Sequence, residues 1–335
     1  MEIDRRNILF KKVSQLLHES RCQVVRSINT AMVYTYFEIG KLIIEEQQHG
    51  KDRAKYGKSV LKNLSEKLTE EVGSGFSVDN LENMRRFYLA YSNSETLSRN
   101  LKSPDFQLSW SHYLKLIRID NPEERRFYEI ESIQNSWSLR ELKRQFDSAL
   151  FQRLALSRDK KGIKKLSQHG QIIEKPKDSL KDPYILEFIG LPENTKYSES
   201  QLEQHLIDKL EQFLLELGKG FTFVARQKRI TFDEKHFKID LVFYNRILKS
   251  FVLIDLKIGE LSHQDIGQIQ MYVNYYDRFV RLDHENKTIG IILCQDKSET
   301  LVEITLPEDN EQIFASKYLT VLPSKETLKR LIEEY

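Results

Sequence analysis

Residues 237–257 read FKIDLVFYNRILKSFVLIDLK, and this stretch decides the fold of the second half of the chain. Two apolar runs, Phe237 to Tyr244 and Phe251 to Lys257, flank a turn from Asn245 to Ser250. Short runs that are rich in branched and aromatic residues and bounded by turn residues are typical of β-strands. The stretch therefore predicts two antiparallel strands of one sheet.

The flanking sequence extends this sheet and adds helices to it. Phe221 to Phe232 predicts a preceding strand, joined to the stretch by the polar residues 233–236, so that three strands form an antiparallel meander. A helix from about Ser200 to Leu217 comes before them and ends at Gly218 and Gly220, because glycine readily adopts the left-handed conformation that ends helices. After the meander the pattern predicts a helix from about Ser262 to Tyr276, strands at Thr288 to Cys294 and near Tyr318 to Leu322, and a terminal helix from Lys325.

The first half of the chain has a different periodicity. Apolar residues recur there at spacings of three and four, as at Leu142 and Phe146, which predicts helices and no strand. Residues 157–182 then lose the apolar period and accumulate lysine, which predicts a basic linker. The expected fold is α+β overall: an all-helical domain over residues 1–156, the linker 157–182, and an α/β domain over residues 183–335 with a central mixed sheet flanked by helices. A chain of 335 residues is long enough for two such cores.

Composition narrows the class of protein. Charged residues make up 30% of the chain while the net charge is only +2, so any nucleic-acid surface has to be a local patch. The two cysteines, Cys22 and Cys294, are too few for a disulfide framework and match no metal-ligand spacing. No run of about 18 apolar residues occurs, and the start MEIDRRNILFKKV lacks the apolar core of a signal peptide. We therefore expect a cytoplasmic protein with no membrane partner.

Charged residues interrupt the apolar strands of residues 237–257 near one end. Asp255 and Lys257 are two apart, so they project from the same face of their strand. Asp240 interrupts the preceding strand and comes opposite the Asp255 region if the two strands pair through their turn. Arg226 and Gln227 precede these strands, and an exposed surface role explains them. Two carboxylates are thus expected to converge on one point, where burial of their charge calls for a metal or a substrate.

Converging carboxylates suit Mg²⁺, which prefers oxygen ligands and keeps several of its waters. A metal so held lowers the pKa of a bound water and neutralises charge that builds on a phosphate. The nearby ammonium of Lys257 can position the water or stabilise the developing oxyanion. The predicted cofactor is therefore Mg²⁺, with Mn²⁺ as a substitute, bound by Asp240 and Asp255. The chemistry that these residue types favour is phosphodiester hydrolysis.

The same residues resemble the signature of a known superfamily. Ile239-Asp240, followed after a hairpin-length gap by Asp255-Leu256-Lys257, looks like the PD-(D/E)XK motif of restriction-endonuclease-like nucleases, with Ile239 in the place of the proline. The resemblance implies a restriction-endonuclease-like α/β domain. It also implies that Asp240 and Asp255 bind metal and that Lys257 assists the attacking water.

Two further features fit this resemblance and also have simpler explanations. Gln268 and Tyr272 look like the QxxxY motif of the RecB-like branch, whose side chains help to hold the site or the substrate, but they equally suit a polar edge and a core aromatic on an amphipathic helix. Glu203 lies in the helix before the meander, where the resemblance implies a further metal-binding acid. Ser200 and Glu203 also match a capping box, in which the glutamate satisfies a free backbone amide. Both explanations stay open for Glu203.

Longer stretches resemble the YhcG-like family of bacterial nucleases. Those in the second half are LEQHLIDKLEQFLLELGKGFTFVARQKRI, IDLVFYNR, DLKIGE and GQIQMYVNYYD. The stretch YFEIGKLIIEEQQHGKDRAKYGKSVLKNLSEKLTEEVGSGFSVDNLENMRRFYLAY resembles the helical domain that precedes this kind of nuclease. The family usually has glutamate where this chain has Asp255, which shortens the implied ligand by one methylene. The resemblance covers both halves of the chain apart from the linker.

One pair of predicted helices in the first half suits DNA binding. Residues 56–72 predict a helix, Gly73-Ser74-Gly75 a turn, and Ser77 the N-cap of a second helix that runs through Tyr91. Two helices joined by a short glycine-containing turn form the helix-turn-helix pattern, whose second helix can enter the DNA major groove. A plain helical hairpin with a solvated basic face explains the pattern equally well. The candidate nucleic-acid-binding residues are Asn80, Asn83, Arg85, Arg86 and Lys58.

The sequence thus predicts a Mg²⁺-dependent nuclease that acts on DNA as an endonuclease and whose helical domain binds DNA or a partner protein. Two alternatives stay open. One is a non-catalytic nucleic-acid-binding scaffold in a defence or mobile-element complex. The other is an RNA-directed nuclease, because the chemistry acts on the phosphate that both polymers share. Expected partners are DNA, proteins of a defence system, and a second copy of the chain, since many such enzymes cut two strands as symmetric dimers.

Overall fold

The fold is known from a computed structural model, which describes residues 2–48, 53–92, 105–156, 160–191 and 197–321. Packing divides the chain into two compact units, residues 1–143 and 144–335. The division falls inside helix α6 (Leu139–Asp147), earlier than the domain boundary expected after residue 156. The difference has a physical reason, because Arg144 and Arg153 both form ion pairs with Glu216 of the sheet-containing unit.

The first unit is built of helices, as the sequence predicts. They are α1 (Glu2–Gln48), α2 (Arg53–Glu71), α3 (Val78–Tyr91), α4 (Trp110–Leu116), α5 (Pro122–Gln134) and the start of α6, and no strand occurs among the residues described in this unit. Gly40 of α1 lets α3 approach closely, because a Cβ atom there would lie 2.1 Å from the carbonyl oxygen of Met84. The buried face of α3 consists of Leu81, Met84, Phe87 and Tyr91.

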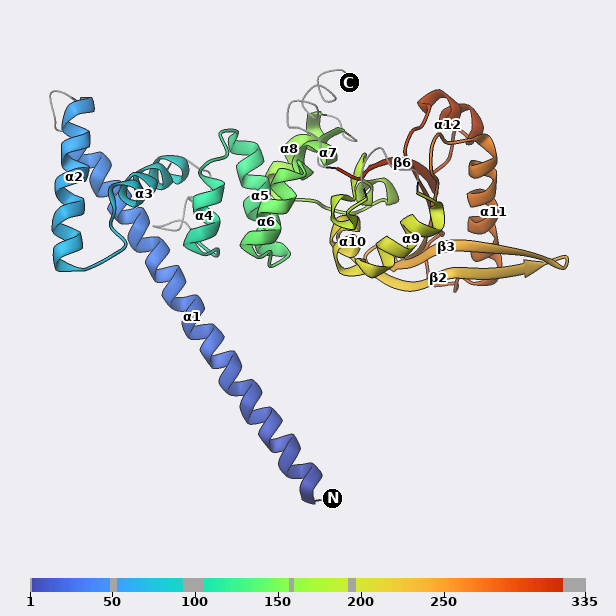
Figure 1. Cartoon of the computed structure of the whole chain (residues 1–335), viewed down its shortest axis with the longest axis horizontal. Coiled ribbons are helices and arrows are strands. Elements are labelled where there is room, and N and C mark those ends of the chain that lie inside the picture. The colour runs from blue at the N-terminus through green and yellow to red at the C-terminus, as the bar shows by residue number, and fades with distance from the viewer. Residues whose placement is uncertain (1, 49–52, 93–104, 157–159, 192–196, 322–335) are drawn as a thin grey trace. The chain divides into compact units, whose positions relative to one another are not determined.

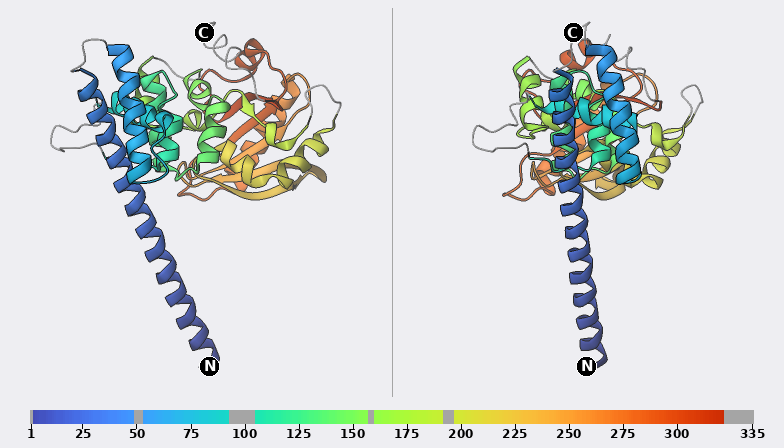
Figure 2. Two further views of the ribbon diagram at one scale, coloured as in Figure 1. Left: turned by 60° about the vertical axis from the view of Figure 1, so that its left-hand side comes forward. Right: turned by 90° about the vertical axis from the view of Figure 1, so that its left-hand side faces the viewer.

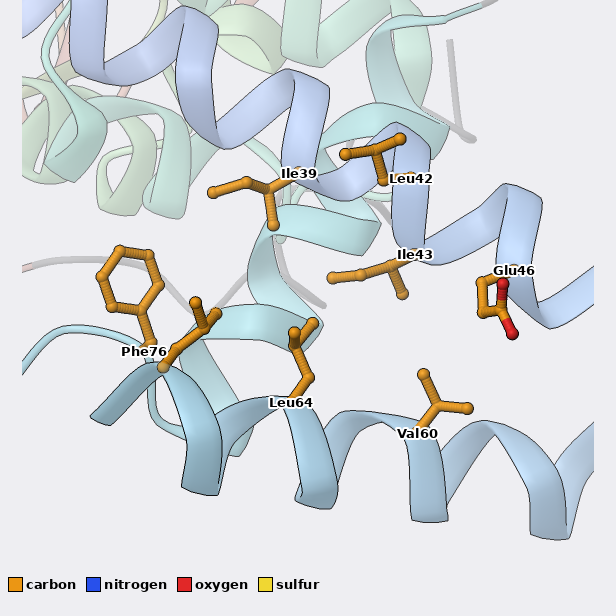
Figure 3. Close-up of a pocket in the computed structure, with 8 residues that line it drawn as sticks. Ile39, Leu42, Ile43, Glu46, Val60, Leu64 and Phe76 are labelled. Atoms are coloured by element: carbon orange, nitrogen blue, oxygen red, sulfur yellow. The ribbon is translucent and has the colours of Figure 1, made fainter. Parts of the chain in front are cut away.

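An apolar groove of about 400 Å³ lies between α1 and α2 (Figure 3). Its lining residues are Ile39, Leu42, Ile43, Glu46, Val60, Leu64, Leu68 and Phe76. Glu46 is the single charged residue of this lining, and no residue that the sequence predicts to be catalytic belongs to it. The groove therefore lacks the converging acids that catalysis at a phosphate would use.

The second unit is a mixed six-stranded sheet flanked by helices (Figures 1 and 2). Its strands are β1 (Tyr184–Ile185), β2 (Phe221–Phe232), β3 (Lys235–Asn245), β4 (Ser250–Leu256), β5 (Ile289–Cys294) and β6 (Ile313–Leu319). The strand order is β1-β6-β5-β4-β3-β2, with β2, β3 and β4 antiparallel and the other neighbours parallel. The α+β fold class and the antiparallel meander are confirmed.

Helices complete this unit. They are α7 (Leu150–Leu156), α8 (Lys160–His169), α9 (Glu199–Asp208), α10 (Leu210–Leu217), α11 (His263–Phe279) and α12 (Glu299–Thr305), with short 3-10 turns η1 (Pro176–Ser179) and η2 (Glu187–Ile189). In the part of the chain that the structure describes, no helix is both long and apolar enough to cross a membrane.

The two faces of the sheet pack against different helices, because successive side chains of a strand alternate between faces. Leu241 of β3 belongs to the core that includes Leu206 of α9, whereas its neighbour Val242 belongs to the core that includes Ile269 of α11. Gly290 of β5 lets α11 lie close to the sheet, since a Cβ atom there would be 2.7 Å from Cγ1 of Ile269. α9 and α11 thus approach the same central strands from opposite sides.

The helix expected from Ser200 to Leu217 is two helices in the structure, with a break at Lys209. The apolar period continues across the break, because Leu206 and Phe213 are two helical turns apart in sequence and pack in the same core. A break that preserves the apolar period leaves no mark in the sequence pattern.

The expected linker, residues 157–182, also differs in the structure. It contains α8 and η1, and both Leu166 and Lys181 are buried. A lysine-rich composition suggests solvated chain, but the ammonium of Lys181 lies 3.9 Å from a carboxylate oxygen of Glu216 in the interior. The terminal helix expected from Lys325 lies outside the described residues.

Candidate active site

Strands β3 and β4 bring Asp240 and Asp255 to one place. Their register pairs Leu241 with Ile254, so the two aspartates come opposite one another one step further along. At this step the backbone amide of Leu256 donates a hydrogen bond of 2.9 Å to Oδ2 of Asp240. Asp255 is only 1% exposed. The structure therefore places the two acids together, as the strand pattern predicts.

Lys257 lies beside these acids. Its Nζ is 3.1 Å from Oδ2 of Asp255 and 3.7 Å from Oδ1 of Asp265, which is in the first turn of α11. Burial lowers the pKa of Lys257, but the neighbouring carboxylates, Asp255 first, outweigh it and raise the pKa above its ordinary value. The ammonium therefore stays charged at neutral pH.

Glu203 reaches the same place from α9. Its side chain is 5% exposed, and Oε1 lies 3.1 Å from Nε of Arg226. The side-chain amide of Gln227 donates hydrogen bonds to Oε2 of Glu203 and, at 3.3 Å, to Oδ1 of Asp240. One amide thus links two acids that are more than thirty residues apart in sequence.

The N-terminal cap of α9 is formed by other residues. Ser198 Oγ accepts from the backbone amide of Gln201, and the Gln201 side chain accepts from the backbone amide of Ser198. The capping box suggested by Ser200 and Glu203 is therefore wrong, because the helix starts two residues earlier. Glu203 faces Gln227 instead of the helix start.

Burial shifts the pKa values of these acids. It raises the pKa of Asp255 to about 7 against the opposing effect of Lys257, and the charge of Asp240 adds to the rise. Burial also raises the pKa of Asp240, partly offset by the amide of Leu256, and that of Glu203, partly offset by Gln227. A bound cation would relieve this penalty, because it favours the charged form of each carboxylate.

Two carboxylate oxygens of the site have capacity for a cation. Oδ2 of Asp255 and Oε1 of Glu203 are buried and accept no hydrogen bond, although each has one ion-pair neighbour, Lys257 and Arg226 respectively. Among the described residues, no group of three or more His, Cys, Asp or Glu side chains is arranged as a complete ligand set. Mg²⁺ commonly takes one or two carboxylates and completes its octahedron with water. The acids present therefore fit a partly hydrated Mg²⁺.

Comparisons with known sequences identify relatives of both parts of the chain. Residues 177–333 match the family described as the YhcG PDDEXK nuclease domain, and residues 12–153 match the DUF1016 N-terminal domain. Over 349 residues the chain is 36% identical to an Escherichia coli (strain K12) protein described as "Putative nuclease YhcG", covering 96% of this chain and 91% of that protein. The chain belongs to the YhcG family. The family resemblance found in the sequence is confirmed, and it supports a hydrolase that acts on nucleic acid.

Solved structures that align with this YhcG-family chain cover a smaller part of it. A repair endonuclease from Pyrococcus abyssi aligns at 17% identity with a TM-score of 0.26, over 38% of this chain and 49% of its own. The structure of an EndoMS–dsDNA2 complex aligns at 14% identity with a TM-score of 0.26, over 40% of this chain and 51% of its own. The chain thus spans about half the length of these proteins.

Gln268 and Tyr272 of the YhcG-family chain brace strand β3. Nε2 of Gln268 donates to the Tyr272 hydroxyl at 2.8 Å, and that hydroxyl donates to the carbonyl oxygen of Lys238 at 2.9 Å. Lys238 precedes Asp240 by two residues, so the pair fixes the backbone of β3 beside the acid. Through these two hydrogen bonds the pair contacts the backbone of β3.

The candidate nucleic-acid-binding residues belong to the other unit. Ser77 caps α3 as predicted, since its hydroxyl accepts from the backbone amide of Asn80 at 3.3 Å. The side chain of Asn80 is also engaged within the protein, because it donates to the carbonyl of Gly75 and accepts from the indole of Trp110 at 3.3 Å. Asn83 is half-buried, and the side chain of Lys58 lies outside the described residues.

The two arginines of α3 share one acid. Arg85 donates two hydrogen bonds to Glu82, at 2.7 and 2.8 Å, and Nε of Arg86 lies 3.3 Å from the same carboxylate. The predicted pair of helices and its turn are present, but the guanidinium groups of Arg85 and Arg86 are engaged by Glu82 of the same helix. The arrangement favours a plain helical hairpin over a face that reads DNA bases.

Gln227 is a site residue that the sequence pattern missed. Its φ of 47° lies in the left-handed region, and its neighbours Arg226 and Lys228 pair regularly with β3 on either side of it. A non-glycine residue in this conformation is strained by roughly 1 kcal/mol or more, and such strain is common at functional sites. An alternating sequence pattern carries no sign of this irregularity, so a surface role was expected for Gln227.

We expect Gln227→Gly to weaken Mn²⁺ binding without lowering thermal stability. Glycine relaxes the left-handed backbone but removes the amide that holds Glu203 and Asp240. Loss of such an outer partner typically weakens metal binding about 10- to 100-fold. Titration calorimetry with Mn²⁺ and a thermal melt of the same sample measure the two effects.

Ser136→Gly, an exposed left-handed position in the other unit, is the control and should leave Mn²⁺ affinity unchanged. Native Mn²⁺ affinity in Gln227→Gly would refute the positioning role.

Proposed function

We propose that this YhcG-family chain is a Mg²⁺-dependent endonuclease that hydrolyses phosphodiester bonds of DNA, with Mn²⁺ as a substitute. The observation that carries the proposal is the meeting of Asp240, Asp255 and Glu203, whose pKa values are raised by burial, beside the charged Lys257. Buried acids with raised pKa values that gather around one point are candidates for a functional site. Family membership supports the class of reaction, and resemblance to restriction-like nucleases favours DNA.

The positions of the site residues support the following roles for them. Asp240 and Asp255 would hold the cation, and Glu203 would add a carboxylate or bind one of its waters. Bound Mg²⁺ supplies a Lewis acid for a phosphate oxygen and acidifies a water. Nζ of Lys257, 3.1 Å from Asp255, is placed to donate a hydrogen bond to the attacking water or to a non-bridging phosphate oxygen. Asp265 helps to orient this ammonium from α11.

Arg226 stands at the rim of the site. Its side chain is 42% exposed while its Nε contacts Glu203, and Nη1 donates to Gln204 at 3.0 Å. A guanidinium suits phosphate because its planar fork donates several hydrogen bonds at once. We therefore assign Arg226 to the phosphate next to the bond that is cut.

The helical domain, residues 1–156, is proposed to bind DNA or a partner protein for the nuclease domain, residues 183–335. The engagement of Arg85 and Arg86 by Glu82 favours a protein partner, which includes a second copy of the chain or a protein of a defence system.

Cleavage assays on linear, nicked and branched DNA test the proposed function. We expect cleavage with Mg²⁺ or Mn²⁺, none with a chelator, and a rate at least about 100-fold lower in Lys257→Ala. Lys249→Ala is the control, because Lys249 is an exposed lysine at the opposite end of β4. Matched DNA and RNA, assayed side by side, distinguish the two substrates. Undiminished cleavage by Lys257→Ala would refute the assignment, and DNA binding without metal uptake would favour the non-catalytic scaffold.

A further inference from the structure

The hairpin of β2 and β3 extends past the end of β4. These two strands pair from Phe221 with Asn245 to Phe232 with Lys235, with a register shift between Phe223 and Ala225. Strand β4 pairs with β3 only between Asn245 and Leu241. Residues 228–239 therefore form a two-stranded arm that starts beside Asp240 and projects beyond the central sheet (Figure 1).

The arm is positively charged in a chain that is nearly neutral. Its exposed cations are Lys228, Arg229, Lys235 and Lys238. Its acids are confined to the turn, at residues 233 and 234. None of the ion pairs in the described part of the chain involves any of the four cations. Because the net charge of the whole chain is +2, this local excess is a distinct feature of the surface.

Two of the arm's cations oppose each other directly. Arg229 pairs with Lys238 across the strands, and like charges at such positions destabilise a sheet. Nη2 of Arg229 lies 2.6 Å from Nε2 of His236. A guanidinium only donates, so Nε2 of His236 accepts there, and Nδ1 of the same ring lies 2.9 Å from the hydroxyl oxygen of Thr231. Arg229 and Lys238 of the arm therefore repel each other, and a bound polyanion would neutralise both charges.

Aromatic side chains hold the arm against α11. The rings of Phe232 and Phe237 stack with centroids 4.9 Å apart, and Phe232 lies 6.3 Å from the ring of Tyr275 on α11. The Tyr272 hydroxyl, also on α11, donates to the backbone carbonyl of Lys238. The cations are thus presented on a fixed support, which reduces the entropic cost of binding a ligand.

We infer that the arm binds the sugar-phosphate backbone of DNA and guides it to the Asp240 site. The inference rests on the proposed function and names the surface that its substrate contacts. The positive charge of the arm complements the phosphates of DNA, and the arm adjoins the Asp240 site. These two features identify DNA as the ligand of the arm. Lys238 lies about 7 Å along β3 from Asp240 and Lys235 about 17 Å, which is the axial rise of roughly five nucleotides in one DNA strand. Arg229 and Lys238 share the face of Asp240, while Lys228 and Lys235 lie on the opposite face, because side chains alternate along a strand. The arm thus presents cations to phosphates from both of its faces, which positions DNA without reading its bases.

The test is a variant in which the four arm cations, Lys228, Arg229, Lys235 and Lys238, are all changed to alanine. Its affinity for a fluorescent DNA duplex is measured by anisotropy on the full chain, with chelator present so that nothing is cut. We expect binding to weaken at least about 10-fold at moderate salt. The slope of log affinity against log salt should shrink by about 0.9 for each phosphate that the variant no longer neutralises. A circular dichroism melt verifies that the variant is folded.

The matched control changes four exposed bases of the same unit that lie outside the arm: Lys164, Lys165, Arg246 and Lys249. This control removes the same charge as the arm variant. Its bases lie outside the arm, so the slope of its log affinity against log salt should stay native. Equal losses in both variants, or a loss seen with duplex RNA and not with DNA, would overturn the inference. Failure of the proposed function gives a different result, namely arm-dependent DNA binding by a chain that cuts nothing when Mg²⁺ is added.

Discussion

Asp255→Asn is expected to abolish cleavage and at the same time to stabilise the metal-free protein. The carboxylate is 1% exposed, and its pKa of about 7 stands well above the ordinary 3.8. An acid whose pKa is raised on folding destabilises the native state progressively as the pH rises from about 4 to about 7. Asparagine carries no charge, so the variant should be more stable at pH 8 by up to about 4 kcal/mol.

Cleavage rates with Mg²⁺ and thermal melts in chelator measure these two effects. We expect the cleavage rate to fall at least about 1,000-fold, because a ligand of the activating cation is removed. The gain in melting temperature should be larger at pH 8 than at pH 5. Asp283→Asn, at an exposed acid of the same unit, should change neither quantity. Retained cleavage, or a lower melting temperature at pH 8, would contradict the role given to Asp255.

Glu216→Gln is expected to cause the largest loss of stability, about 3–5 kcal/mol, which is the usual cost of breaking a buried ion pair. Oε1 of Glu216 accepts from Nη1 of Arg153 at 2.5 Å and from the amide of Ile185 at 3.0 Å, while Oε2 lies 3.4 Å from Arg144. Arg153, Lys181 and Glu216 are all buried. A neutral glutamine would leave two buried cations without their counter-ion.

The pH dependence of Glu216 has the opposite sign to that of Asp255. Burial would raise the pKa of Glu216, but Arg153, Lys181 and Arg144 outweigh burial and lower it to about 2. Its stabilisation is therefore present above the ordinary value of 4.5 and is lost as the pH falls toward 2. Urea unfolding of native protein and variant should differ most at neutral pH and converge in acid. Glu211→Gln, an exposed position on α10, is the control. Equal unfolding free energies at pH 7 would disprove the structural role of Glu216.

Local sequence pattern was sufficient to predict the meander and its two acids. The bounds of β2 match the prediction because glycine precedes the strand and a polar turn follows it. Asp240 and Asp255 could be placed together because a short turn leaves adjacent strands little choice of register. The helix expected from about Ser262 begins there in the structure, where the Ser262 hydroxyl caps α11.

The parts that the sequence did not predict depend on contacts between distant residues. The left-handed backbone of Gln227 arises where β2 meets Glu203 and Asp240, and no local pattern encodes that meeting. Lys181 lies in a lysine-rich segment and is distinguished only by its proximity to Glu216. Composition shows how many charges a segment has, whereas tertiary packing decides which of them are buried.

A structure of the full chain grown with Mn²⁺, with the metal located by its anomalous scattering, tests the central claim most directly. We predict an anomalous peak about 2.1–2.2 Å from carboxylate oxygens of both Asp240 and Asp255, the distance expected for a small divalent cation. The peak should be absent from crystals of Asp255→Asn. Mn²⁺ bound elsewhere, with Lys257 still 3.1 Å from Asp255 and no metal between the two aspartates, would contradict the account.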